Sequence, residues 1–149
     1  FGVITACSFC QDPNESHSHL FFDCLFSSRV WHAIQGKCNV NWPDLHWPGI
    51  ITYATGETKG KTLRANVLKL ALMCTVYNLW LERNYRKFSN VSKPVEVVIK
   101  SIIHMVRGRL LSVNTFPRSP GDKWFLTHWN LPENVLKPLS SVRNGRAAE

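Results

Sequence analysis

The sequence lacks a hydrophobic run long enough to span a membrane. Its longest strongly apolar stretch, residues 66–81, has sixteen residues and contains Lys69. A helix that spans a bilayer needs about 20 predominantly apolar residues. We therefore expect no membrane-spanning segment in this sequence.

The sequence also lacks the residue clusters that common catalytic sites need. Its ten acidic residues are scattered singly, whereas polymerases and nucleases hold two metal ions about 4 Å apart with clustered carboxylates. Residues 56–61, GETKGK, lack the spacing of a glycine-rich phosphate-binding loop. A zinc deaminase needs His-x-Glu before a later C-x-x-C, and the order here is different. We therefore expect that the chain is not an enzyme.

The sequence nevertheless has the composition of a folded domain with a basic surface. It has 149 residues, of which 44% are hydrophobic and six are tryptophan, and this length is typical of one domain. Residues 1–59 hold three basic and five acidic side chains, whereas residues 60–149 hold fifteen and five. Such asymmetry indicates contact with nucleic acid or a membrane surface, although a well-solvated surface explains it equally well.

The clearest motif lies near the N-terminus, where three of the five cysteines fall within the first 24 residues. Cys7-x2-Cys10-x8-His19-x4-Cys24 supplies three thiols and one imidazole, the donors that Zn²⁺ binds as a tetrahedron. With four protein ligands, no position is left for water, so the ion would be structural. His17 is the alternative to His19. We prefer His19 because Leu20, Phe21 and Phe22 follow it and can hold the loop against the core. Buried thiols beside unrelated histidines are the alternative to a metal site.

The periodicity predicts a mostly α-helical fold with a small, irregular, zinc-bound N-terminal module packed on a helical hairpin. A short helix is predicted over 27–35, a long one over 61–88, and a third from Pro94. We divide the chain into a zinc module with its short helix (1–36), an ordered loop pinned by its tryptophans (37–60), the hairpin (61–112), and a Pro-rich segment with a basic tail (113–149).

Two apolar stripes run along the long predicted helix, so we expect it to be buried on several sides. They consist of Leu63, Val67, Leu70, Cys74, Tyr77 and Leu81, and of Leu68, Leu72, Val76 and Leu79. Basic residues follow near the ends of both hairpin helices, namely Arg83, Arg86, Lys87, Arg107 and Arg109. Positive side chains there suit the negative end of the helix dipole, and they also suit contact with phosphates.

These motifs resemble the zinc-binding domain that follows the polymerase in plant LINE-type (non-LTR) retrotransposon reverse transcriptases. The resemblance rests on Cys7-Ser-Phe-Cys10, Glu15-Ser16, His19-Leu-Phe-Phe-Asp-Cys24 and Val30-Trp31. Further along, Tyr77-Asn-Leu-Trp80-Leu-Glu82-Arg83-Asn84, then Arg86 and Phe88, and finally Trp129-Asn-Leu-Pro132, are similar to the segments downstream of that domain. The resemblance covers nearly the whole chain, most tightly residues 7–31 and 77–88.

The resemblance implies a non-catalytic piece of a retroelement protein whose Cys7, Cys10, His19 and Cys24 bind one zinc ion. It implies an intracellular location, with the nucleus as one alternative. It also implies a role in holding RNA or target DNA near the polymerase. In that interpretation Arg83, Arg86, Lys87, Arg107 and Arg109 contact phosphates, and aromatic side chains stack on unpaired bases. The alternatives are a structural appendage that docks on the polymerase domain, and a non-functional relic of such an element.

Overall fold

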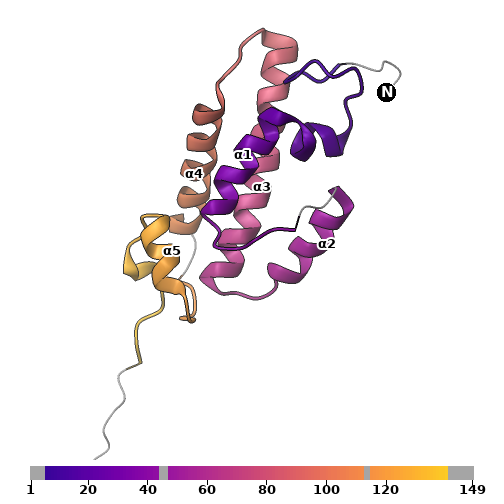
Figure 1. Cartoon of the computed structure of the whole chain (residues 1–149). Helices are drawn as coiled ribbons and strands as arrows, with labels where there is room; N and C mark the ends of the chain where they lie inside the picture. The colour runs from indigo at the N-terminus through magenta and orange to yellow at the C-terminus, as the bar shows by residue number, and fades with distance from the viewer. Residues whose placement is uncertain (1–5, 44–46, 113–114, 141–149) are drawn as a thin grey trace, which may run out of the picture.

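The computed structural model describes residues 6–43, 47–112 and 115–140, which form the mostly α-helical fold that the sequence predicts (Figure 1). Its α-helices are α1 (Leu25–Gly36), α2 (Trp47–Glu57), α3 (Leu63–Asn84), α4 (Val95–Ser112) and α5 (Asp122–His128). The described residues also include π-helical turns at His19–Asp23 and Tyr85–Ser89 and a 3-10 turn at Glu133–Val135. None of these helices is long and apolar enough to cross a membrane.

The long helices α3 and α4 form the antiparallel hairpin (Figure 1). Thr62 caps α3, because its side-chain oxygen accepts a hydrogen bond from the backbone N–H of Ala65 at 3.2 Å. The α-helical geometry ends at Asn84 rather than at residue 88, and the chain continues as the π-helical turn. Asn90 then takes a left-handed conformation, with φ of 52°, that asparagine tolerates well. Pro94 directly precedes α4, where its missing N–H costs little.

The hydrophobic core lies where α1 packs against both helices of the hairpin (Figure 1). Residues fully shielded from solvent come from all three helices: Val30 and Ile34 of α1, Leu63, Val67, Leu68, Ala71 and Leu79 of α3, and Ile102, Val106 and Leu110 of α4. A two-helix hairpin leaves one side of each helix open, so α1 is needed to close the core. Because α1 begins immediately after Cys24, the last of the four predicted ligands also marks the start of the helix that closes the core.

The sequence predicts a loop over residues 37–60, and this prediction is wrong for Trp47–Glu57, which form α2. Pro48 and Gly49 indicate a chain break on composition, but Pro48 lies in the first turn of α2, where proline is tolerated. Ile50, Tyr53 and Ala54 have helical spacing and turn toward the core. The prediction that tryptophan pins this segment is nevertheless correct for Trp42, which is buried with its ring between those of Trp31 and Tyr53.

The buried face of α3 differs from the predicted stripes at both apolar and polar positions. Tyr77 belongs to a predicted stripe but is 48% exposed. Three polar side chains, Thr75, Asn78 and Glu82, are buried instead. Each of them has a hydrogen-bond partner, and Thr75 and Asn78 bond to carbonyl groups one turn earlier. Such partners offset the desolvation of polar groups, which a hydrophobic pattern does not register.

The Pro-rich segment docks on the helices through aromatic side chains, as its tryptophans suggest. Phe125 and Trp129 are buried, and Trp124 is partly buried. The indole Nε1 of Trp129 donates a hydrogen bond to the carbonyl oxygen of Lys37 at 2.6 Å. Phe116 and Leu136 form a single parallel bridge that closes the segment. Residues 141–149, most of the predicted basic tail, lie outside the described residues.

Candidate metal centre

The first two cysteines of the motif lie on one tight turn. The backbone N–H of Gln11 donates to the carbonyl of Cys7 at 2.9 Å, and the N–H of Cys7 donates to the carbonyl of Asp12 at 2.7 Å. Gln11 closes the turn with a φ of 67°. These bonds fold the chain back on itself, so the Cys7 and Cys10 sulfurs face the same point.

The other two ligand positions come from the start of the helical region. His19 begins the π-helical turn His19–Asp23, and its backbone N–H donates to the hydroxyl of Ser16 at 3.1 Å. The N–H of Cys24 donates to the carbonyl of His19 at 2.7 Å, and Cys24 is the N-cap of α1. The turn therefore sets both the distance between His19 and Cys24 and the direction in which α1 leaves the site.

The four predicted ligands form one compact group. One ligand atom from each of Cys7, Cys10, His19 and Cys24 lies within 4.8 Å of the others. The sulfurs of Cys7 and Cys24 are 3.9 Å apart, and His19 Nε2 lies 3.2 Å from the Cys10 sulfur. Zn–S bonds of about 2.3 Å in a tetrahedron place two sulfurs about 3.8 Å apart. The donor set and its spacing therefore fit a tetrahedral metal ion.

The group is shielded on one side by the residues that follow the histidine. Cys7 and Cys24 are buried, whereas Cys10 is exposed and His19 is half-buried. Leu20, Phe21 and Phe22 are buried, as expected if they hold the loop against the core. Phe9 stacks on Phe26 of α1, with ring centroids 4.7 Å apart. His17 lies outside the group, so the structure brings together the set that contains His19.

The surroundings of the cysteines shift their thiol pKa values in opposite directions. Burial raises the pKa of Cys24 to about 12 and also raises that of Cys7. At Cys10 the backbone N–H of Asp12 lowers the pKa, because it stabilises the thiolate. Without a cation, burial therefore disfavours the thiolate form of Cys7 and Cys24. A bound metal ion supplies the positive charge that buried thiolates need.

Two arginines of the predicted nucleic-acid set connect this site to the end of α3. Arg83 Nε donates to Glu15 Oε1 at 2.7 Å. Glu15 lies in the segment 7–24 that carries the four candidate ligands, which we call the metal loop. Arg86 donates to Glu82 Oε1 at 2.8 Å, and its guanidinium lies 4.5 Å from the centre of the Phe26 ring. Both side chains are mostly buried. Their hydrogen bonds are directed at this chain, so they hold the metal loop and α1 against the hairpin.

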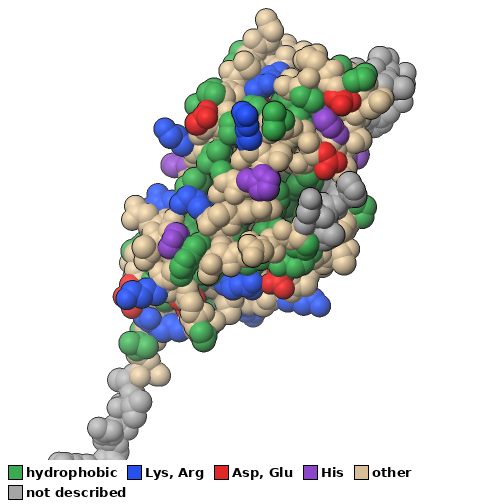
Figure 2. Space-filling model, in the orientation of Figure 1, with side chains coloured by type: hydrophobic (Ala, Val, Ile, Leu, Met, Phe, Trp, Pro, Cys, Tyr) green, Lys and Arg blue, Asp and Glu red, His purple; other side chains and the backbone are tan. Residues whose placement is uncertain are grey.

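The other three residues of the predicted nucleic-acid set are one arginine bonded within the chain and two exposed cations. Arg107 donates to the carbonyl oxygens of Trp129 and Asn130, at 2.8 and 2.9 Å, and thereby fixes the C-terminal segment on α4. Arg109 and Lys87 are exposed. Within residues 6–43, 47–112 and 115–140, neither makes an ion pair, and the Lys87 ammonium lies 5.8 Å from the centre of the Phe88 ring. Basic side chains on the face in Figure 2 are scattered rather than gathered in one patch.

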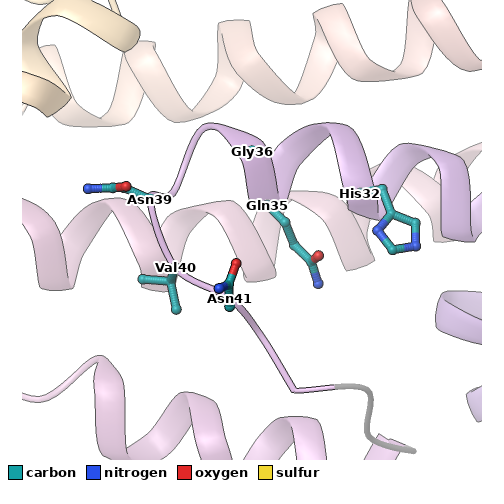
Figure 3. A pocket seen from close by; sticks show the side chains of 6 residues that line it. All are labelled: His32, Gln35, Gly36, Asn39, Val40 and Asn41. Carbon is teal, nitrogen blue, oxygen red and sulfur yellow. The ribbon is translucent and has the colours of Figure 1, made fainter.

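Two surface features were not predicted as sites. Tyr77 and Trp80 stack on each other on the outer side of α3, both about half exposed. Separately, a pocket of about 370 Å³ lies beside the end of α1, lined by His32, Gln35, Gly36, Asn39, Val40 and Asn41 (Figure 3). Its lining residues offer side-chain amides and one imidazole but include no Asp, Glu, Lys or Arg. No pattern in the sequence indicates that Gln35 and Asn41 line the same pocket.

Comparisons with protein-family models, with curated proteins and with solved structures found nothing that matches this chain. The features that bear on function are therefore the compact Cys/His group, the surface of the helices and the sequence motifs.

Proposed function

We propose that Cys7, Cys10, His19 and Cys24 bind one structural zinc ion. The observation that carries this proposal is that four donor atoms, three sulfurs and one nitrogen, lie within 4.8 Å of one another. This mixture of thiolate and imidazole is the set that structural zinc sites use, whereas magnesium and calcium prefer oxygen ligands. With four protein donors the site has no open position for water or substrate, so the ion would stabilise the fold rather than act in catalysis.

We further propose that the chain is the non-catalytic zinc-binding domain of a LINE-type retrotransposon reverse transcriptase and binds nucleic acid. The proposal is supported by the motif resemblance over residues 7–31 and 77–88 and by fifteen basic against five acidic residues after residue 59. The positive excess favours a polyanionic partner. In this interpretation zinc orders the N-terminal loop, and the loop places α1 on the hairpin that contacts RNA or DNA.

Two measurements on the full chain test the two parts of the proposal. Atomic emission on freshly reduced protein should give one zinc per chain, and Cys10→Ser should lose it, whereas Cys38→Ser, at a buried thiol outside the group, should keep it. Absence of zinc from the freshly reduced protein, after refolding with added zinc, would contradict the metal site. Fluorescence anisotropy with a labelled single-stranded RNA should then show binding that weakens steeply as salt rises, because phosphate contacts release counterions.

The alternative function is a structural appendage that docks on the polymerase domain. The exposed apolar side chains on α3, including Met73 at 58%, favour it. Apolar docking changes little with salt, because it does not depend on counterion release. A lack of RNA binding at low salt, or binding insensitive to salt, would therefore contradict the nucleic-acid proposal and favour this alternative.

A further inference from the structure

The outer side of α3 carries large side chains that the fold leaves open to solvent. Met73, Tyr77 and Trp80 are 58%, 48% and 49% exposed, although the rest of α3 is largely buried. The Tyr77 and Trp80 rings are nearly parallel, at 28°, with centroids 6.4 Å apart. Single exposed apolar residues are common on protein surfaces, whereas a contiguous group usually marks an interaction site.

The exposed charged residues along α3 and just after it are basic. Lys69, Met73, Tyr77 and Trp80 are separated by four, four and three positions, so they lie on one face of α3. Lys69 is exposed one turn before Met73, and Lys87 is exposed about two turns after Trp80. The one acidic residue of α3, Glu82, is 2% exposed and bonded to Arg86 and the Lys93 backbone. The aromatic pair is thus flanked by lysines at both ends, with no carboxylate of α3 exposed near it.

We propose that Tyr77 and Trp80 form a platform on which two unpaired bases of a single-stranded nucleic acid stack, while Lys69 and Lys87 contact its phosphates. This inference rests on the proposed nucleic-acid-binding function and assigns a surface to it. Lysines on either side of exposed rings match the alternation of bases and phosphates along a single strand. A duplex hides the faces of its bases, so stacking on this pair favours single strands.

Three of the arginines predicted to contact phosphates are already bonded within the chain, so other cations are needed for that contact. Arg83, Arg86 and Arg107 direct their guanidinium groups at partners within the chain. Lys69 and Lys87 have no ion-pair partner among the residues that the structure describes. The cations without an ion-pair partner in the described part of the chain thus include two that lie about two turns before and after the exposed rings.

The test measures binding of a fluorescein-labelled 15-nucleotide oligo(U) by anisotropy, at low salt, with the zinc-loaded full chain. Tyr77→Ala with Trp80→Ala should weaken binding at least about tenfold, because the loss of one stacked base alone costs about that factor. Tyr77→Phe with Trp80→Phe keeps two flat rings and should stay within about threefold of the original affinity. Leu111→Ala, at an exposed apolar residue of α4, is the matched control and should bind unchanged. Both aromatic positions are half exposed, so circular dichroism should show the same helicity in every variant.

The outcomes separate this inference from the function on which it rests. If the original chain binds oligo(U) and the double alanine variant binds equally well, the platform is wrong while nucleic-acid binding stands. If the original chain does not bind, both fail, and the exposed face fits a protein partner better. If the alanine variant loses binding to oligo(U) and to a 15-base-pair duplex by the same factor, stacking is again contradicted, since the rings reach only unpaired bases.

Discussion

Arg83, at the end of α3, forms an ion pair with Glu15 in the metal loop, although 68 residues separate them in the sequence. Their side chains are only 20% and 11% exposed, so the pair lies at the junction between the loop and the hairpin. A basic residue that the sequence presents as a candidate for phosphate contact thus has a partner inside the chain. The pair couples the order of the metal loop to the long helix.

We expect Arg83→Ala to lower the free energy of unfolding by about 2 kcal/mol, because it leaves a mostly buried carboxylate without its charged donor. Urea denaturation of the zinc-loaded protein measures this change. Arg109→Ala is the control, since Arg109 is exposed and without an ion pair in the described part of the chain. Equal midpoints for the two variants would show that the Arg83–Glu15 pair does not hold the loop.

Zinc removal should unfold mainly the N-terminal module. A closed zinc site contributes folding free energy directly, and here its ligands set the turn at Cys7 and the start of α1. We expect Cys7→Ser, Cys24→Ser or a chelator to abolish hydrogen-exchange protection over residues 7–36. Protection in α3 and α4, whose contact with each other does not pass through the loop, should fall much less. Equal loss of protection in all helices would instead make the metal a requirement for the whole core.

The helices and the metal group were predictable because each has a strong local signal. Apolar periodicity marks α1, α3 and α4, and close spacing marks Cys7, Cys10, His19 and Cys24. α2 is not predicted because Pro48 and Gly49 indicate a chain break, whereas its Tyr53 packs on the ring of Trp42, which precedes the helix.

Side-chain partners distant in sequence were not predictable in the same way. Glu82 is buried because Arg86 and the backbone N–H of Lys93 donate hydrogen bonds to its carboxylate. Arg83 points inward because the carboxylate of Glu15 accepts its hydrogen bond. Composition counts all such residues as surface charge. The same limit explains why Tyr77 was assigned to the core and is exposed, since helical periodicity does not reveal which side of a long helix its neighbours cover.

The two histidines of the loop should differ sharply in their effect on metal binding. His19 Nε2 lies beside the Cys10 sulfur, whereas His17 is outside the group and exposed. We expect His19→Ala to weaken zinc binding by at least about tenfold, and His17→Ala to leave it unchanged. Competition with a chromophoric zinc chelator at pH 7 measures both affinities. The reverse order of effects would identify His17 as the fourth ligand.

Thiol reactivity should rank the cysteines of the metal-free protein by exposure and pKa. Iodoacetamide reacts with the thiolate, so a lowered pKa speeds labelling near pH 8 and a raised pKa slows it. Cys10 is exposed and lies in the loop that zinc removal should unfold, so it should react first. Cys38 is buried and burial raises its pKa to about 12, so it should stay unlabelled until the chain unfolds. Mass spectrometry of labelled peptides checks this order, and bound zinc should protect Cys10.

Glu82 should be the polar residue of the hairpin whose loss costs most stability. Its Oε1 accepts hydrogen bonds from Arg86 Nε at 2.8 Å and from the backbone N–H of Lys93 at 2.7 Å, and Arg86 Nη2 donates to the Lys93 carbonyl at 3.0 Å. These bonds close the connection between α3 and α4. Glu82→Ala leaves a mostly buried guanidinium and an amide without their acceptor, so it should cost about 3 kcal/mol of unfolding free energy.

Glu82→Gln is the matched variant, because its amide oxygen keeps one acceptor at the same place. It should cost about 1 kcal/mol, since a neutral acceptor replaces a charged one. Thermal and urea unfolding of the zinc-loaded proteins measure both variants, and zinc content should be unchanged because Glu82 is outside the metal group. If both substitutions cost the same, the charge of Glu82 matters more than the hydrogen bond to Lys93. If neither costs stability, the helix packing alone closes the hairpin.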